Sequence, residues 1–347
     1  MNAPQSSSDP LLSIRNLDVT FGRGDKETRA VDGVSYDVPA GTIVGVVGES
    51  GSGKSVTSLA VMGLLPQRGC RTSGEILFDG VNLLGRSDAE MSRIRGKEIA
   101  MVFQDPMSSL NPVVPVGTQV TEVLRTHEKV SAAEARDRAG DLLKRCGIPD
   151  PLRRLKEYPH QLSGGMRQRA MIAIALACKP RLLICDEPTT ALDVTIQAQV
   201  LELLAELVSD LGTAMIMITH DLGVVAGLCD HVNVMYAGRI VESAPRRELF
   251  ANPQHRYTQG LLHSIPRLDH PRGAPLQPIP GTPRDTVAWD KACAFAPRCR
   301  YVTEECVTPE IDLDELSAGH QVRCVHPATR AETIADGSAA TAQEATA

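Results

Sequence analysis

The sequence predicts an α/β fold with a parallel sheet at its centre, and three observations support this class. An apolar run at Ile43–Val47 precedes a glycine-rich loop and a second apolar run at 56–62. Short apolar runs also occur at 182–185, which ends in two adjacent carboxylates, and at 214–219 and 231–236, and we expect a strand at each. Residues 11–38 alternate between apolar and polar, and residues 104–163 and 194–211 have helical spacing. We therefore expect an antiparallel β subdomain, a helical subdomain and a small cysteine-rich C-terminal extension around the parallel core.

Length and composition narrow the function classes. The 347 residues exceed one ordinary domain, which predicts a main domain with an appendage. Aromatic residues make up only 3% of the chain, which suits an aliphatic α/β interior. The net charge is −6 and no basic stripe appears, so we expect no nucleic-acid partner. No apolar stretch approaches the eighteen or so residues of a membrane span, and residues 1–9 lack the features of a secretory signal.

The loop 48–55, GESGSGKS, has the composition of a phosphate-binding loop. Its glycines let backbone N–H groups curl around the β- and γ-phosphates of a nucleotide. Lys54 adds positive charge, and the Ser55 hydroxyl is placed to bind Mg²⁺. Because the loop joins a strand to a helix, as the motif requires, we expect a P-loop NTPase. The expected nucleotide-binding residues are Gly48, Glu49, Ser50, Gly51, Ser52, Gly53, Lys54, Ser55 and Val56.

Asp186 and Glu187 follow the predicted strand at 182–185. A buried parallel strand delivers such residues to the sheet edge that also carries the phosphate loop. Two adjacent carboxylates at this place can divide the work. We expect Asp186 to hold Mg²⁺ through water and Glu187 to act as the general base that polarises the attacking water.

A second predicted phosphate-binding feature lies at Ser163, Gly164 and Gly165, directly before a helix that we expect at about 166–179. Free N–H groups and one hydroxyl at a helix N-terminus suit the γ-phosphate of a nucleotide. Because the chain already has its own phosphate loop, this second feature predicts contact with a nucleotide held by another subunit.

With these motifs in this order, residues 11–250 resemble the ATP-binding-cassette (ABC) ATPases, in which two domains enclose two ATP molecules head to tail. The resemblance implies that Phe21 stacks on adenine, that Gln104 is the Q-loop glutamine and a further Mg²⁺ contact, and that Asp193 belongs to the D-loop. It also implies that His220 is the switch histidine that contacts the γ-phosphate, so that Glu187, His220 and Gln104 form the catalytic set.

Longer strings narrow the resemblance to the ATPases of dipeptide, oligopeptide and nickel importers. They are residues 103–112, 158–166, 186–195 and 252–259. Residues 162–166 resemble the ABC signature motif, and Met166 stands where that motif usually ends in Gln. The resemblance implies ATP hydrolysis coupled to peptide uptake at the cytoplasmic face of the cell membrane. The implied partners are a second ABC ATPase in a heterodimer, two integral-membrane permeases and an extracytoplasmic solute-binding protein. Nickel or haem import, and a soluble ABC ATPase acting on ribosomes or DNA, remain as alternatives.

The domain organisation follows from the same patterns. We expect a disordered lead at 1–10, an ATPase domain at 11–250 with its helical subdomain at about 105–177, an extension at 251–328 and a disordered tail at 329–347. Proline recurs after Pro245, which predicts an extended linker as far as about residue 286.

The extension contains four cysteines, Cys293, Cys299, Cys306 and Cys324, in a segment too small to fold on its own core. A cytosolic location disfavours disulfides, and structural zinc usually draws on closely spaced cysteine pairs. Widely spaced thiolates can enclose a [4Fe-4S] cluster. The dipeptide-importer ATPases, which this pattern resembles, carry such a cluster. Zn²⁺ and thiols without a metal remain alternatives, and His320 and His326 are alternative ligands.

Overall fold

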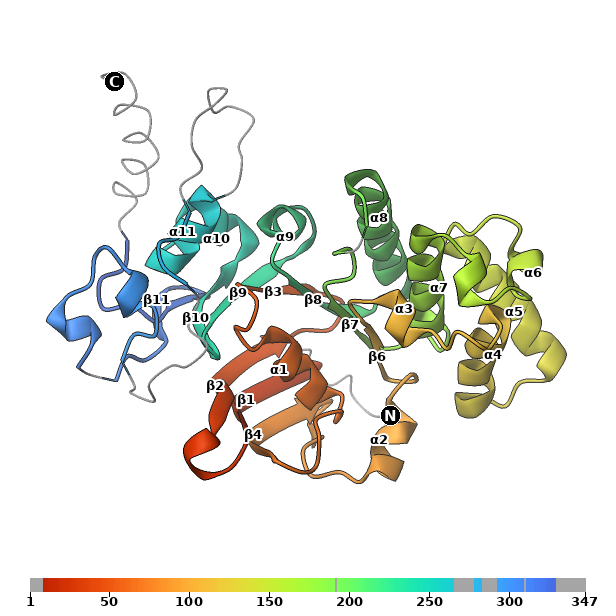
Figure 1. Cartoon of the computed structure of the whole chain (residues 1–347), viewed down its shortest axis with the longest axis horizontal. Coiled ribbons are helices and arrows are strands. Elements are labelled where there is room, and N and C mark those ends of the chain that lie inside the picture. Colours follow the sequence, from red (N-terminus) through yellow and green to blue (C-terminus); the bar gives the residue numbers. More distant parts are fainter. Residues whose placement is uncertain (1–8, 191, 265–277, 283–291, 309, 329–347) are drawn as a thin grey trace, which may run out of the picture.

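Two β-sheets organise the chain, which a computed structural model describes for residues 9–190, 192–264, 278–282, 292–308 and 310–328. In the described part, the smaller sheet has four strands and the larger one has eight. Figure 1 shows the smaller sheet, in red and orange, below the larger one. Four predicted features lie wholly or partly outside the described residues: the tail, most of the lead, most of the proline-rich linker, and Ala191 of the expected D-loop.

The larger sheet has a parallel centre. Parallel strands run in the order β9, β3, β8, β7 and β6. All residues of β7 and β8 are buried, as in a sheet that is covered on both faces. The four strands predicted from short apolar runs are confirmed, and β6 was not predicted. Their bounds are β3 (Ile43–Val47), β6 (Ile99–Val102), β7 (Leu182–Asp186), β8 (Ala214–Thr219) and β9 (His231–Tyr236).

Successive residues of the parallel strands enter two different cores. Leu183 and Cys185 of β7 pack in the core that includes residues of α7, α8 and α9. Leu182 and Ile184 pack in the core that includes α1 and the smaller sheet. The alternation follows from the two-residue period of a strand, which sends neighbouring side chains to opposite faces. The helices are α1 (Lys54–Val61), α7 (Gly164–Leu176), α8 (Val194–Leu211) and α9 (Leu222–Leu228).

The predicted antiparallel subdomain is present. β1 (Leu12–Phe21) pairs with β2 (Thr28–Val38) on one side and with β4 (Cys70–Phe78) on the other. A short 3₁₀ turn, η1 (Gly24–Lys26), lies between β1 and β2. The fourth strand is β5 (Val81–Asn82), and the short helix α2 (Asp88–Ile94) follows it.

The helices expected at about 105–177 gather at the right of Figure 1. Ser131 caps α5, because its hydroxyl accepts the backbone N–H of Glu134 at 3.2 Å. The helix after the signature was expected at 166–179, but α7 begins at Gly164, where Ser163 caps it, and ends at Leu176. The other elements are α3 (Pro106–Ser109), α4 (Val116–His127), α5 (Ala132–Arg145), α6 (Pro151–Arg154) and η2 (Pro159–Gln161).

The expectation of an extended linker from residue 245 is wrong for residues 246–264. This stretch forms α10 (Arg246–Ala251) and α11 (Arg256–His263). The side chains of residues 254–259 are buried, although most of them are polar. The repeated prolines suggested a linker, and the two short helices in this stretch were missed.

The extension continues the larger sheet. β10 (Arg239–Pro245) pairs antiparallel with β9, β12 (His320–Val322) pairs with β10, and β11 (Asp314–Ser317) pairs with β12. Two short 3₁₀ turns, η3 (Ala296–Arg298) and η4 (Glu304–Cys306), carry part of the cysteine-rich segment. The extension therefore packs directly on the ATPase core. No helix in the described part of the chain combines the length and hydropathy needed to cross a bilayer.

Candidate functional site

The phosphate loop lies between β3 and α1, and its backbone requires glycine. Gly51 and Gly53 have φ values of +81° and +100°, which favour glycine over any residue with a Cβ. A Cβ on Gly53 would also collide with the backbone oxygen of Ala30, whereas one on Gly51 would meet open space. The loop is thus fixed closely against the antiparallel subdomain at one glycine and is open at the other.

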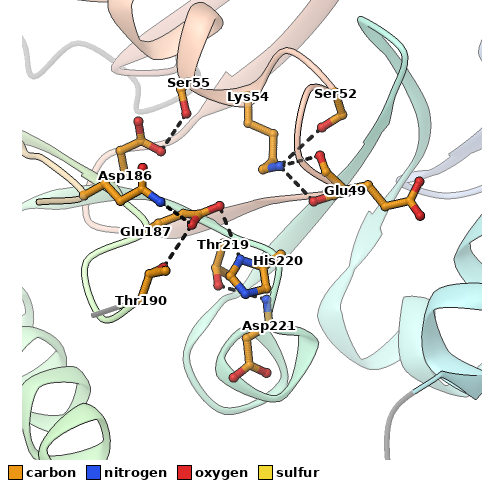
Figure 2. Close-up of polar contacts among 12 residues, drawn as sticks. Glu49, Ser52, Lys54, Ser55, Asp186, Glu187, Thr190, Thr219, His220 and Asp221 are labelled. Atoms are coloured by element: carbon orange, nitrogen blue, oxygen red, sulfur yellow. Dashed lines mark hydrogen bonds and ion pairs between the residues drawn. The ribbon is translucent and has the colours of Figure 1, made fainter. Parts of the chain in front are cut away.

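Lys54 closes the loop from within. Its ammonium group donates to the carbonyl oxygens of Gly48 at 2.8 Å and Glu49 at 2.9 Å, and to Ser52 Oγ at 3.3 Å. The side chain is buried, and this burial lowers the pKa of Lys54 against the opposing effect of nearby carboxylates. Figure 2 shows the ammonium group turned toward Ser52 and Glu49 of the loop. A cation held within the loop suits the negatively charged phosphates of a nucleotide.

Asp186 ends β7 opposite Ser55, the second residue of α1. Ser55 Oγ donates to Asp186 Oδ1 at 2.9 Å, although 131 residues separate them. Burial raises the pKa of Asp186, and the Glu187 carboxylate adds to this, whereas the hydrogen bond from Ser55 and the charge of Lys54 oppose it. The structure therefore brings together two of the three residues predicted to serve Mg²⁺.

Glu187 lies at the centre of the remaining polar residues (Figure 2). Its Oε2 accepts hydrogen bonds from Gln104 Nε2 at 2.8 Å and Thr190 Oγ1 at 2.9 Å. Its Oε1 lies 3.3 Å from His220 Nδ1. The backbone of Glu187 has a φ of +46°, a sparsely populated conformation for a residue with a Cβ. Such strain persists where the surroundings fix the residue in place, as the N–H of Glu187 does by donating to the Ile218 oxygen at 2.9 Å.

The residues present fit a magnesium–nucleotide complex. Among the described residues, no group of three or more His, Cys, Asp or Glu side chains is arranged to hold a metal ion alone. Mg²⁺ needs no such group, because it usually takes one or two protein oxygens and completes its shell with phosphates and water. Ser55 and Asp186 offer those oxygens, with Gln104 close to the same edge through Glu187. Bound Mg²⁺ would neutralise phosphate charge there.

The expected signature residues lie apart from this group. Ser163 caps α7 by accepting the N–H of Met166 at 3.4 Å, and Gly164 begins the helix. Ser163 and Gly164 are exposed, and Gly165 packs near Ile196. In Figure 1, α7 belongs to the helical subdomain, well separated from α1. The two predicted phosphate-binding features thus lie apart from each other in this chain.

Two further residues predicted to act at the site, Phe21 and Asp193, make their contacts outside the group around Glu187. Phe21 ends β1, half-buried, opposite Thr28 and Cys70. Asp193 caps α8 by accepting the N–H of Ile196 at 3.0 Å. Ser50 and Val56, also predicted to bind nucleotide, lie in the loop and in the first turn of α1.

The four cysteines of the extension face one small cavity with a volume of about 10 Å³, lined also by Tyr301 and His326. All four are free thiols. Burial raises the pKa of Cys324 to about 12, and the neighbouring thiols add to this. Burial likewise raises the pKa values of Cys293 and Cys299. Four thiols are the ligands that a metal ion or cluster bound by thiolates requires. In the described chain, however, the four sulfur atoms do not lie close enough together to form a metal-binding group.

Of the two alternative ligands, His320 is committed elsewhere. Its Nε2 lies 2.8 Å from Glu242 Oε1, and both side chains are buried. His326 lines the cysteine cavity, and its Nε2 lies 2.8 Å from Thr303 Oγ1. His320 is therefore not a ligand candidate in this structure, and His326 remains one.

Sequence reasoning missed three residues that contact the site. Thr190 donates to Glu187, Tyr257 accepts the backbone N–H of Glu49, and Arg298 pairs with the Glu49 carboxylate. Thr190 follows Glu187 by three residues, a spacing that could have indicated the contact. Tyr257 and Arg298 come from the extension, more than 200 residues away, and no local pattern points to them.

Comparisons with known proteins agree with this geometry. Residues 31–190 match the "ABC transporter" family model, and residues 241–306 match "Oligopeptide/dipeptide transporter, C-terminal region". The chain is 51% identical to the dipeptide transport ATP-binding protein DppD of Bacillus subtilis over 93% of this chain and 97% of that protein. It is 50% identical to a putative peptide import ATP-binding protein of Brucella melitensis over 92% and 98%.

A solved structure shows the same fold over the ATPase domain. It is a dimeric ATP-binding cassette in a post-hydrolysis state, bound to ADP and phosphate. The match has a TM-score of 0.61 and 28% identity, and covers 68% of this chain and 99% of that one.

Proposed function

This chain belongs to the ABC transporter ATP-binding proteins of the oligopeptide and dipeptide class, and from that premise we propose that it hydrolyses ATP to drive peptide import. The observation that carries the proposal is the convergence of Lys54, Ser55, Asp186 and Glu187 at one sheet edge. Lys54 and the loop bind the phosphates, and Ser55, Asp186 and Gln104 serve Mg²⁺. Glu187 takes the proton of the attacking water.

The remaining site residues complete this scheme. We propose that Phe21 stacks on the adenine and that His220, 3.3 Å from Glu187, contacts the γ-phosphate. Ser163, Gly164 and Gly165 contact the nucleotide of a partner ATPase, and Asp193 lies at the junction between the two subunits. The separation of the signature from the phosphate loop supports this division, because one subunit cannot bring both to one nucleotide (Figure 1).

The proposed assembly contains a second ABC ATPase in a heterodimer, two integral-membrane permeases and an extracytoplasmic solute-binding protein. The chain would bind to the cytoplasmic face of the membrane through the permeases. Residues 11–250 would form the ATPase domain with its helical subdomain at about 105–177, and residues 251–328 the extension.

ATPase assays can test whether the site needs two subunits. The isolated chain should hydrolyse ATP poorly, and addition of the second ATPase and the permeases should restore turnover. A monomer, verified by light scattering, with the kcat of the complex would overturn the two-subunit scheme.

The import proposal can be tested in cells. Deletion of the gene should abolish growth on a dipeptide as the only source of a required amino acid, while growth on the free amino acid continues. A Glu187→Gln copy should fail to restore growth, and a copy with the exposed Glu206→Gln substitution should restore it. Normal dipeptide growth in the deletion strain, with loss of nickel or haem uptake instead, would move the cargo to those alternatives.

We further propose that the four cysteines hold a [4Fe-4S] cluster that staples the extension and takes no part in ATP chemistry. Four free thiols around one cavity support this, since a cluster is bound by thiolates. Bound iron would also offset the burial that raises the pKa of Cys324, because metal binding drives thiol deprotonation.

Metal analysis decides between the cluster and zinc. Anaerobically purified protein should be brown and contain about four iron and four sulfide per chain. Cys299→Ser should bleach it, whereas Cys70→Ser, at a half-buried cysteine of β4, should not. About one zinc with no iron or sulfide, from iron-replete cells, would assign structural zinc instead.

A further inference from the structure

Glu49, the second residue of the phosphate loop, is held on each of its polar groups. Its carboxylate accepts hydrogen bonds from the two terminal nitrogens of Arg298 at 2.6 and 3.1 Å. Its backbone N–H donates to the Tyr257 hydroxyl at 2.8 Å, and its carbonyl accepts from Lys54 at 2.9 Å. Two of these three contacts come from outside the ATPase domain. In Figure 2 the Glu49 side chain points away from Lys54, toward the extension.

The pairing of Arg298 with Glu49 is a part-buried contact made by two hydrogen bonds. Arg298 is only 7% exposed, and its Nε also donates to the Pro280 oxygen at 2.9 Å. The guanidinium carbon lies 5.8 Å from the ring centre of Tyr236 and 5.9 Å from that of Phe295. In this geometry the arginine has little freedom, and removal of it would leave the Glu49 carboxylate without its counter-charge.

Tyr257 is fixed equally firmly. The ring is fully buried, with its centre 4.7 Å from that of Tyr236 and 5.4 Å from that of Phe295. Tyr236 belongs to β9, next to the strand that feeds the phosphate loop, whereas Tyr257 lies on α11 and Phe295 precedes η3. This aromatic cluster therefore links the extension to the core of the ATPase domain directly behind the loop.

The same segment also lines the cysteine cavity. Arg298 ends η3 and is followed by Cys299, whose N–H donates to the Ala296 oxygen at 3.1 Å. Phe295 and Cys293 also line the cavity. A change in how the cysteines are held would thus move the short turn that positions Arg298.

We propose that Arg298 and Tyr257 are positioning residues for nucleotide binding, which set the conformation and charge of Glu49 so that the extension tunes the affinity of the phosphate loop. The inference rests on the proposed binding of ATP at this loop. Without Arg298, the Glu49 carboxylate would stay next to the loop as an unpaired negative charge and repel the nucleotide phosphates. By linkage, a bound nucleotide must in turn stabilise the segment that carries Arg298.

A titration of the full chain with a fluorescent ATP analogue tests the charge effect. Arg298→Met should raise the Kd about tenfold, which corresponds to about 1.4 kcal/mol. Arg300→Met is the matched control, since Arg300 is exposed and lies over the ring of Tyr301. This control should stay within about twofold of the wild type. Tyr257→Phe, which keeps the ring and removes the acceptor of the Glu49 N–H, should raise the Kd about threefold to fivefold.

Charge rescue separates positioning from a general loss of folding. When Glu49→Gln is added to Arg298→Met, the Kd should return to within about threefold of the Glu49→Gln single variant, because no unpaired charge remains. Hydrogen–deuterium exchange supplies the reciprocal readout. Nucleotide should slow exchange at residues 293–306 in the wild type and not in Arg298→Met.

Three results would overturn the inference. They are wild-type affinity in Arg298→Met, no recovery of affinity in the double variant, and an exchange response at 293–306 that is independent of Arg298. If the wild-type chain did not bind the analogue at all, the proposed function itself would be wrong, and that outcome is distinct from the other three.

Discussion

Gln104 and Glu187, 83 residues apart, share a hydrogen bond of 2.8 Å between Nε2 and Oε2. Gln104 lies two residues beyond the end of β6, where the chain enters the helical subdomain. Glu187 directly follows β7. Glu187 Oε2 also accepts a hydrogen bond from Thr190, whereas Oε1 faces His220. Movement of the helical subdomain that withdraws Gln104 would therefore change the hydrogen bonding of the proposed general base.

Glu187→Gln should abolish turnover and preserve nucleotide binding. The amide keeps the size of the side chain and can still accept from Thr190, but it cannot take a proton from water. We expect kcat of the assembled transporter to fall on the order of 10²-fold or more, with ATP affinity within about threefold of wild type. Steady-state phosphate release and equilibrium nucleotide binding measure the two quantities.

The matched control is Glu206→Gln on α8, at an exposed position. It should leave both quantities unchanged. ATPase activity near that of the wild type in Glu187→Gln would show that another group serves as the base.

Asp186→Asn should stabilise the nucleotide-free chain while it removes Mg²⁺-dependent activity. Burial raises the pKa of Asp186 above its unfolded value of 3.8, so the folded state binds this proton more tightly than the unfolded state does. The free energy of unfolding therefore falls as the pH rises from the unfolded-state pKa of Asp186 to its higher folded-state pKa. The asparagine carries no such penalty.

Thermal unfolding without nucleotide checks the sign of this effect. The gain in Tm from Asp186→Asn should be larger at about pH 8 than at about pH 5. Asp137→Asn, at an exposed position on α5, should give no gain. A lower Tm in Asp186→Asn at neutral pH would contradict the burial penalty.

Gly53→Ala should destabilise the chain more than Gly51→Ala. Both glycines have positive φ, so both alanines carry backbone strain, but only the Cβ at position 53 collides with the Ala30 oxygen. We expect the excess cost at position 53 to be about 1–3 kcal/mol, from overpacking against a backbone that cannot move freely. Urea unfolding of both variants measures the difference, and equal costs would show that the collision is relieved elsewhere.

The fold was predictable where the pattern was local. β3, β7, β8 and β9 follow from short apolar runs, and α8 from its helical spacing. The polar residues at the carboxyl ends of β7 and β8 were predictable for the same reason, because parallel strands deliver them to one edge.

The contacts of the extension were not predictable in this way. α11 is short and polar, and its burial depends on tertiary contacts. Tyr257 of α11 packs against the Tyr236 ring, and Glu242 accepts the backbone N–H groups of Gln254 and His255 just before the helix. The bond between Arg298 and Glu49 joins residues 249 positions apart. No periodicity within a window of sequence carries that information, and it emerges only when β12 places the extension on the sheet.

Transport by the reconstituted complex tests the central claim most directly. The chain, its partner ATPase and the two permeases would be placed in vesicles with the solute-binding protein on the substrate side, and accumulation of a labelled dipeptide would be measured. We predict uptake that requires ATP and is lost when this chain carries Glu187→Gln. Undiminished peptide uptake with that substitution, or ATP-driven uptake of nickel or haem in place of any peptide, would contradict the account.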